Sequence, residues 1–129
     1  MRVMINEAAL EAALRARDFE IVRPERLSAA VQVQMAQEAQ VIVGPTGAAM
    51  TNALFAPAGA RIVEIQPRNF TSQWVWAISQ RAGAEWRGYI CASPVEPRRV
   101  GWRHRIRRGF GFGYEVPLDH VLAFVDAAL

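Results

Sequence analysis

Apolar and polar positions follow two periods along the chain, and each period predicts one kind of secondary structure. Apolar residues three or four positions apart predict helices over residues 7–16, 28–38, 48–55, 70–82 and 117–129. Short apolar or alternating runs that end at Pro or Gly predict strands over residues 19–22, 41–43, 61–65 and 85–90. The pattern is lost between residues 94 and 116, where Trp102, His104 and Ile106 alternate with arginines and leave a hairpin as one interpretation.

Residues at the ends of the predicted helices fit the expected caps. Asn6 and Ser28 precede the first two helices, and both side chains accept hydrogen bonds from the free N–H groups of a helix start. Pro117 suits the first position of the last helix, and Gly83 suits the end of the fourth. In that fourth helix we expect Trp74 in the core and Trp76 on another face.

The alternation of helices and strands with short connections predicts the α/β class. We expect a Rossmann-like open parallel sheet of about four or five strands with helices on both faces. The continuous apolar run 41–43 predicts a strand buried on both faces. Because a helix comes first, we expect a leading strand upstream of the chain.

A chain of 129 residues suits one core. We expect residues 1–93 to form the Rossmann-like domain, residues 94–116 an arm or hairpin rich in Arg, Gly and aromatic residues, and residues 117–129 a helix that completes the domain.

Composition narrows the class further. With 52% hydrophobic and 21% charged residues the chain is globular, and its apolar runs are too short to span a membrane. The polar residues near the N-terminus do not suit a signal peptide. A lone cysteine, Cys91, excludes an internal disulfide and a Cys-rich metal site, and we expect it to be buried at a strand end. The expected location is the cytoplasm.

The net charge of +3 comes from one cluster of arginines. All 15 basic residues are Arg, and six of them fall within residues 98–108, so the rest of the chain is net acidic. We interpret this cluster as a solvated arm, with contact to a diphosphate or acidic glycan as an alternative. No nucleic-acid motif accompanies the cluster, so we expect no nucleic-acid partner, although a basic nucleic-acid-binding protein remains the third hypothesis.

One loop carries candidate chemistry. Gly44-Pro45-Thr46-Gly47-Ala48 joins a predicted strand to a predicted helix. Glycines let a ligand approach the backbone closely, and the free N–H groups of a helix start favour an anion, most naturally phosphate. The alternative is that the turn merely connects the two elements.

Glu64 is the second candidate, because it is a carboxylate among apolar strand residues. It either lies at the sheet edge or pairs with Arg61, or it accepts hydrogen bonds from ligand hydroxyls such as those of a ribose. His104 and His120 are expected to be solvated. The sequence therefore identifies no catalytic base and no metal ligands.

Together these segments carry a family resemblance. Residues 6–7, 19–28, 39–55, 57–59 and 63–67, with Gln32, resemble the glycosyltransferase family 61 domain in the same order. The most specific elements are G-P-x-G-A at 44–48 and T-N-x-L-F at 51–55. The family usually has His at the position of Thr46. The resemblance covers about residues 2–92. The family includes proteins of capsular-polysaccharide synthesis.

This resemblance implies one half of a GT-B fold, the C-terminal half that holds the nucleotide-sugar. It implies an inverting glycosyltransferase of glycan or polysaccharide synthesis, with a nucleotide-sugar donor, a glycan or other hydroxyl acceptor and no further cofactor. Because the base would come from the other half, we expect the chain alone to be inactive. The implied nucleotide-sugar-binding residues are Gly44, Thr46, Gly47, Ala48, Thr51, Asn52 and Glu64. The alternative is a non-catalytic Rossmann-like module that binds a nucleotide or a protein.

An unpaired sheet edge and an apolar last helix favour self-association. The apolar residues of that helix are Leu118, Val121, Leu122, Val125 and Leu129. They pack on their own domain or on a second copy. We expect a homodimer or a missing N-terminal domain, with a monomer covered by its own C-terminal arm as the alternative.

Overall fold

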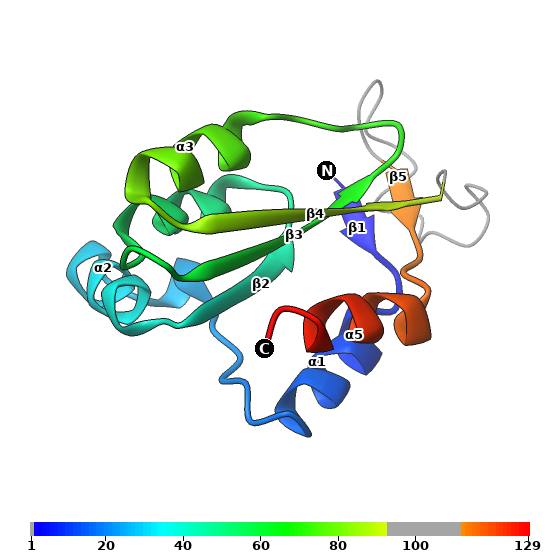
Figure 1. The fold of residues 1–129 in the computed structure, drawn as a ribbon. Helices are drawn as coiled ribbons and strands as arrows, with labels where there is room; N and C mark the ends of the chain where they lie inside the picture. The colour runs from blue at the N-terminus through cyan, green and yellow to red at the C-terminus, as the bar shows by residue number, and fades with distance from the viewer. Residues whose placement is uncertain (1, 93–111) are drawn as a thin grey trace.

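The computed structural model describes residues 2–92 and 112–129. Its central sheet contains β2 (Val41–Pro45), β3 (Arg61–Pro67) and β4 (Glu85–Cys91) in that order (Figure 1). Both pairings are parallel. The predicted Rossmann-like α/β class is therefore confirmed.

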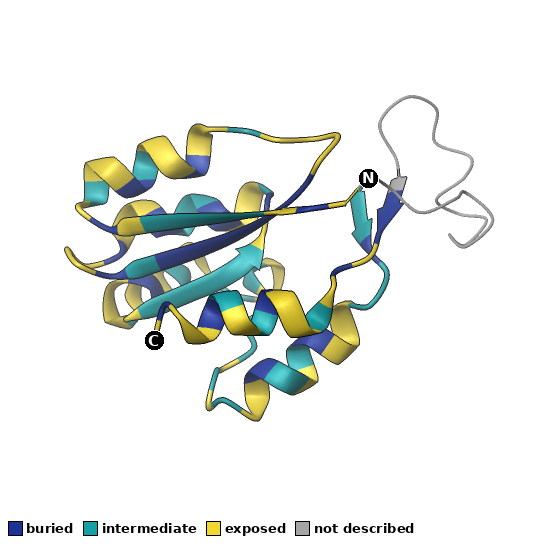
Figure 2. Ribbon diagram, turned by 45° about the vertical axis from the view of Figure 1, so that its right-hand side comes forward, coloured by how far each residue is buried: buried dark blue, intermediate teal, exposed yellow. Residues whose placement is uncertain are grey.

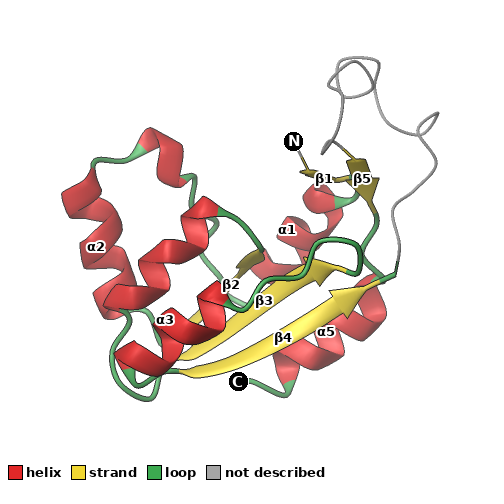
Figure 3. Cartoon of the chain, turned by 90° about the horizontal axis from the view of Figure 1, so that it is seen from above, coloured by secondary structure: helices red, strands yellow, loops and turns green. Residues whose placement is uncertain are grey.

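Helices cover both faces of this sheet (Figure 3). One layer contains α1 (Glu7–Arg15) and α5 (Leu118–Asp126). The other contains η2 (Ala48–Phe55) and α3 (Trp74–Ala82), with α2 (Ala29–Glu38) packed against η2. The segment predicted as the third helix is a 3-10 helix, and Pro24–Arg26 forms a short 3-10 turn, η1.

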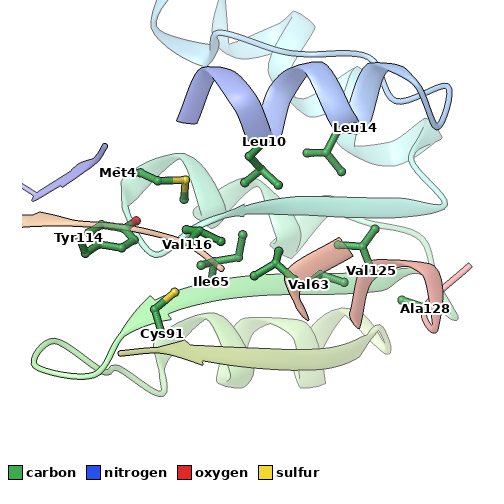
Figure 4. Close-up of a cluster of buried hydrophobic side chains, with 11 residues drawn as sticks. Met4, Leu10, Leu14, Val63, Ile65, Cys91, Tyr114, Val116, Val125 and Ala128 are labelled. Carbon is green, nitrogen blue, oxygen red and sulfur yellow. The ribbon is translucent and has the colours of Figure 1, made fainter. Parts of the chain in front are cut away.

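The central strand β3 supplies both hydrophobic cores, because successive side chains of a strand point to opposite faces. Val63 and Ile65 join a core under α1 and α5 (Figure 4), whereas Ile62 joins a second core under η2 and α3. Figure 2 shows β3 buried along most of its length. Val121 and Val125 are buried in the first core, so α5 packs on its own domain.

A second, two-stranded sheet joins the two ends of the chain. β1 (Arg2–Met4) pairs in parallel with β5 (Phe112–Tyr114), beyond the carboxyl ends of the central strands. The sequence did not predict either strand, because three residues are too few to establish a period. Of the predicted arm at residues 94–116, the part 94–111, including His104 and the arginines of 98–108, lies outside the described residues, and the remainder contains β5.

The prediction of a strand at 19–22 is wrong. This segment forms no helix or strand, and it pairs with no strand in the part of the chain that the structure describes. The prediction that 41–43 is buried on both faces is also wrong: β2 is an edge strand, and Val41, Ile42 and Val43 are only half-buried. The reason is the same for both, because a cavity separates residues 19–22 from β2.

The helix starts and faces need three corrections. Ser28 caps α2 as predicted, by accepting a hydrogen bond from the Val31 N–H, but Asn6 makes no such cap bond. The fourth helix begins at Trp74 and ends at Gly83 in the left-handed conformation. Trp74 is 41% exposed, and so is not in the core, because Val75 and Ser79 form the inward face instead.

Candidate functional site

A cavity of about 750 Å³ runs along the free side of β2. Its walls are residues 44–49 at the end of β2 and the start of η2, one side of α1, and residues 17–24, which lead from α1 into η1. A volume of this size accommodates a small organic ligand. The cavity therefore lies at the carboxyl end of a parallel strand, where open α/β sheets usually bind ligands.

The loop continues the sheet for one residue and then starts η2. The Thr46 N–H donates to the Ile65 carbonyl at 2.9 Å, and the Met50 N–H donates to the Gly47 carbonyl at 3.0 Å. At Gly47 the backbone is extended, and an added Cβ would meet only the Pro45 carbonyl oxygen, at 3.9 Å. Neither strain nor packing requires glycine there, so the space over Gly47 is open to a ligand.

Gly44 has a packing role. A Cβ at this position would lie 2.7 Å from Met50 Sδ, which is closer than such atoms approach. Glycine thus lets the Met50 side chain lie against β2. The two glycines therefore have different roles, because Gly44 makes room for the Met50 side chain whereas Gly47 leaves free space.

Five of the seven site residues predicted from the resemblance line the cavity: Gly44, Thr46, Gly47, Ala48 and Asn52. Thr46 is nearly buried, whereas Ala48 is exposed. Thr51 does not line the cavity, and its hydroxyl donates to the Ala48 carbonyl, which stabilises the first turn of η2. Glu64 does not line it either.

Asn52 joins η2 to the preceding elements through Gln32. Asn52 Nδ2 donates to Gln32 Oε1 at 3.0 Å, and Gln32 Nε2 donates to the carbonyls of Pro24 and Leu27 at 2.8 and 3.1 Å. The Gln and Asn of the family resemblance therefore hold the wall of the cavity together.

Glu64 is fully buried on the central strand. Its Oε2 accepts a hydrogen bond from Trp86 Nε1 at 2.9 Å, while Oε1 has no hydrogen-bond partner among the described residues. The interpretation that Glu64 lies at a sheet edge or pairs with Arg61 is therefore wrong. Its partner, Trp86, is 22 residues away in sequence, and no local pattern indicates it.

Arg23 is a cavity residue that the sequence analysis missed. Its guanidinium pairs with the Glu11 carboxylate, and this hydrogen bond, with the added charge attraction, raises the pKa of Arg23 above its usual value. Both residues line the cavity. The arginine precedes Pro24 in a segment predicted as a strand, which gave no reason to place it at a site.

Other candidate chemistry is limited within residues 2–92 and 112–129. That part contains no group of three or more His, Cys, Asp or Glu able to hold a metal ion, and none of its helices has the length and apolar character to cross a membrane. Cys91 is buried at the end of β4, as predicted, and burial raises the pKa of its thiol. His120 is exposed on α5.

The fold and the cavity define a Rossmann-like α/β protein with a cavity beside β2. The family model described as glycosyltransferase 61 matches residues 1–63, and this match supports the resemblance to that family. It includes the loop 44–48 and the 51–55 element, and it ends one residue before Glu64. Neither the comparison with curated proteins nor that with solved structures found a match. The family match supports a glycosyltransferase role in glycan synthesis, with a sugar donor and an acceptor.

Proposed function

We propose that this chain is the nucleotide-sugar-binding half of an inverting glycosyltransferase, of the kind used in capsular polysaccharide synthesis, and that it acts in the cytoplasm. The observation that carries the proposal is the cavity beside β2, whose loop 44–48 lies inside the segment that matches glycosyltransferase 61. In GT-B terms this is the C-terminal half of the enzyme.

The residues around the loop suit a diphosphate. The Thr46 hydroxyl and the backbone N–H groups at the start of η2 offer hydrogen-bond donors, and the open space over Gly47 leaves room for the diphosphate. Arg23 lies on the opposite wall of the same cavity, where it is paired with Glu11, so its guanidinium offers further N–H donors rather than an unpaired charge. Such donors stabilise the negative charge that develops on a leaving diphosphate.

In the proposed reaction a base removes the proton of an acceptor hydroxyl, which attacks the anomeric carbon while the diphosphate leaves. The configuration at this carbon is inverted because the hydroxyl attacks on the side opposite the leaving diphosphate. The donor half holds the diphosphate, and the base comes from the other half of a GT-B enzyme. We therefore expect this chain alone to bind donor without transferring sugar to a glycan or other hydroxyl acceptor.

Calorimetry with UDP, GDP, ADP and CDP tests the proposal. At least one should bind the wild type, and Gly47→Val should abolish binding without unfolding the protein, because the added side chain enters open space. Thr71→Val, on an exposed residue outside the cavity, is the matched control.

If none of the four nucleotides binds, the proposal is refuted. If Gly47→Val leaves binding intact, the loop is not part of the site. Sugar turnover by this chain alone would refute the half-site, and binding without turnover after addition of an N-terminal half would favour a non-catalytic module.

We also propose that the chain forms a homodimer through β4, which is the edge strand of the described central sheet that does not face the cavity, because a free edge is a template for strand pairing. Ile90 on β4 is 57% exposed, as is Leu129, which was predicted to be on the apolar face of the last helix. Light scattering at micromolar concentration should give twice the 14.4 kDa of one chain. A species of one chain mass would refute the dimer.

A further inference from the structure

Glu64 is enclosed by glycines within the sheet. In the parallel register it lies opposite Gly44 on β2 and Gly88 on β4, so its immediate neighbours on both strands have no side chain. Residues opposite one another in register point to the same face of a sheet. The carboxylate therefore emerges between two strips of bare backbone, and other side chains are free to lie across them.

Two side chains occupy this space. The Trp86 ring lies across Gly88, where an added Cβ would be 2.3 Å from the ring, and Met50 lies against Gly44, where the distance to Sδ would be 2.7 Å. Trp86 donates its Nε1–H to one carboxylate oxygen of Glu64. The Met50 side chain is a thioether without an N–H or O–H group, so it donates no hydrogen bond to the other carboxylate oxygen.

The free oxygen needs a reason, because a buried acceptor without a partner costs about 1–3 kcal/mol. Glu64 is 0% exposed, and its Oε1 has no partner among the residues that the structure describes. An apolar side chain at this position has no hydrogen-bonding group and would avoid that cost. The carboxylate is thus suited to a hydrogen-bond donor that comes from outside the protein.

Met50 lies between the cavity and the position next to Glu64. It lines the cavity, and it also fills the space over Gly44, the residue opposite Glu64 in the register of β2 and β3. Methionine is unbranched and has three rotatable side-chain bonds, so it changes rotamer at low cost. A turn of this side chain therefore opens the space over Gly44, beside Glu64, to the cavity.

We propose that Met50 is a movable cover between the cavity and Glu64, and that Trp86 is a positioning residue that holds the carboxylate with Oε1 ready for a ligand hydroxyl. The hydroxyl donates its hydrogen to Oε1 when Met50 turns aside. The identity of the ligand rests on the proposed function, whereas the cover does not.

Carboxyl labelling with a carbodiimide and an amine tests the cover without any ligand. In the wild type Glu64 should be labelled at least tenfold more slowly than the exposed Glu25. Met50→Ala should raise the rate at Glu64 at least tenfold. Met35→Ala, which truncates another methionine of the cavity wall, should leave that rate unchanged. An unchanged rate at Glu64 in folded Met50→Ala, checked by circular dichroism, overturns the cover.

Calorimetry with UDP, GDP, ADP and CDP, and with their 2′,3′-dideoxy forms, tests the hydroxyl acceptor. The wild type should bind the complete nucleotide at least tenfold more tightly, and Met50→Ala should tighten that binding a few-fold. Trp86→Phe should reduce the tenfold preference to about twofold while binding of the dideoxy form stays unchanged, which a merely structural role would not produce. Equal binding of both forms by the wild type overturns the acceptor role but leaves the proposed function intact. Absence of all binding overturns the acceptor role together with nucleotide binding, and the labelling result still decides the cover.

Discussion

Asn6 pairs its carboxamide with both backbone groups of Val116, 110 residues away. Asn6 Nδ2 donates to the Val116 carbonyl at 2.7 Å, and the Val116 N–H donates to Asn6 Oδ1 at 2.9 Å. The amide thus imitates one more step of the pairing between β1 and β5, next to the bond from the Ile5 N–H to the Tyr114 carbonyl. This side chain joins the N-terminal segment to the segment that leads into α5.

Asn6→Ala should lower the free energy of unfolding by about 1–3 kcal/mol, because it leaves the half-buried backbone groups of Val116 unpaired. Asn6→Asp should lower it too, since a carboxylate retains the acceptor but loses the donor. Urea denaturation measures both effects. Asn69→Ala, on an exposed residue, is the control and should change stability little. Equal stability of Asn6→Ala and Asn69→Ala would contradict the role of this pairing.

The ion pair of Arg17 and Asp126 should make stability depend on acid. Arg17 Nε and Nη2 donate to the two carboxylate oxygens at 2.7 and 3.1 Å, and this hydrogen bonding lowers the pKa of Asp126 and raises that of Arg17. A lowered carboxyl pKa stabilises the fold above the pKa of the unfolded chain, and the contribution is lost as the pH falls through the folded value.

The comparison of wild type with Asp126→Asn should follow that sign. The difference in unfolding free energy should be small and constant above about pH 5, and it should decline toward zero as acid protonates the carboxylate. Added salt should reduce it at neutral pH, because the pair is exposed. Asp119→Asn, on the exposed first turn of the same helix, is the control. A difference that grows with acid would contradict the pairing.

Gly88→Ala should destabilise the protein by about 1–3 kcal/mol, because the added methyl group meets the Trp86 ring. Displacing that ring also breaks its hydrogen bond to Glu64, which tryptophan fluorescence should report as a changed emission maximum. Gly47→Ala adds the same methyl group at an open position, and it should leave stability and emission unchanged. Equal behaviour of the two variants would contradict the packing at Gly88.

Gln32→Ala should cost about 1–3 kcal/mol, because one side chain serves the carbonyls of Pro24 and Leu27 as well as Asn52. A double-mutant cycle with Asn52→Ala should give a coupling energy of about 0.5–3 kcal/mol. Gln34→Ala, on the exposed side of the same helix, is the control. Additive effects of Gln32→Ala and Asn52→Ala would show that the bond between them contributes nothing.

Local pattern was sufficient for the elements that satisfy themselves nearby. The sequence by itself predicted α1, α2, α3 and α5, the strands β2 to β4, and the buried position of Cys91. It also placed the loop 44–48 at the end of a strand. These features follow from apolar spacing, from the Ser28 cap and from Gly83, whose causes all lie within a few residues.

Tertiary structure decided everything that needs a distant partner. Residues 19–22 have a strand pattern, yet a ladder requires a neighbouring strand at the right distance, and the cavity lies in that place. Asn6 has the chemistry of a cap, yet Val116 takes both ends of its amide. Glu64 has one partner on the next strand, and its other oxygen has none within residues 2–92 and 112–129, because the register sets it between two glycines. Sequence spacing carries no record of such long-range pairings, since they depend on which backbones the whole fold brings together.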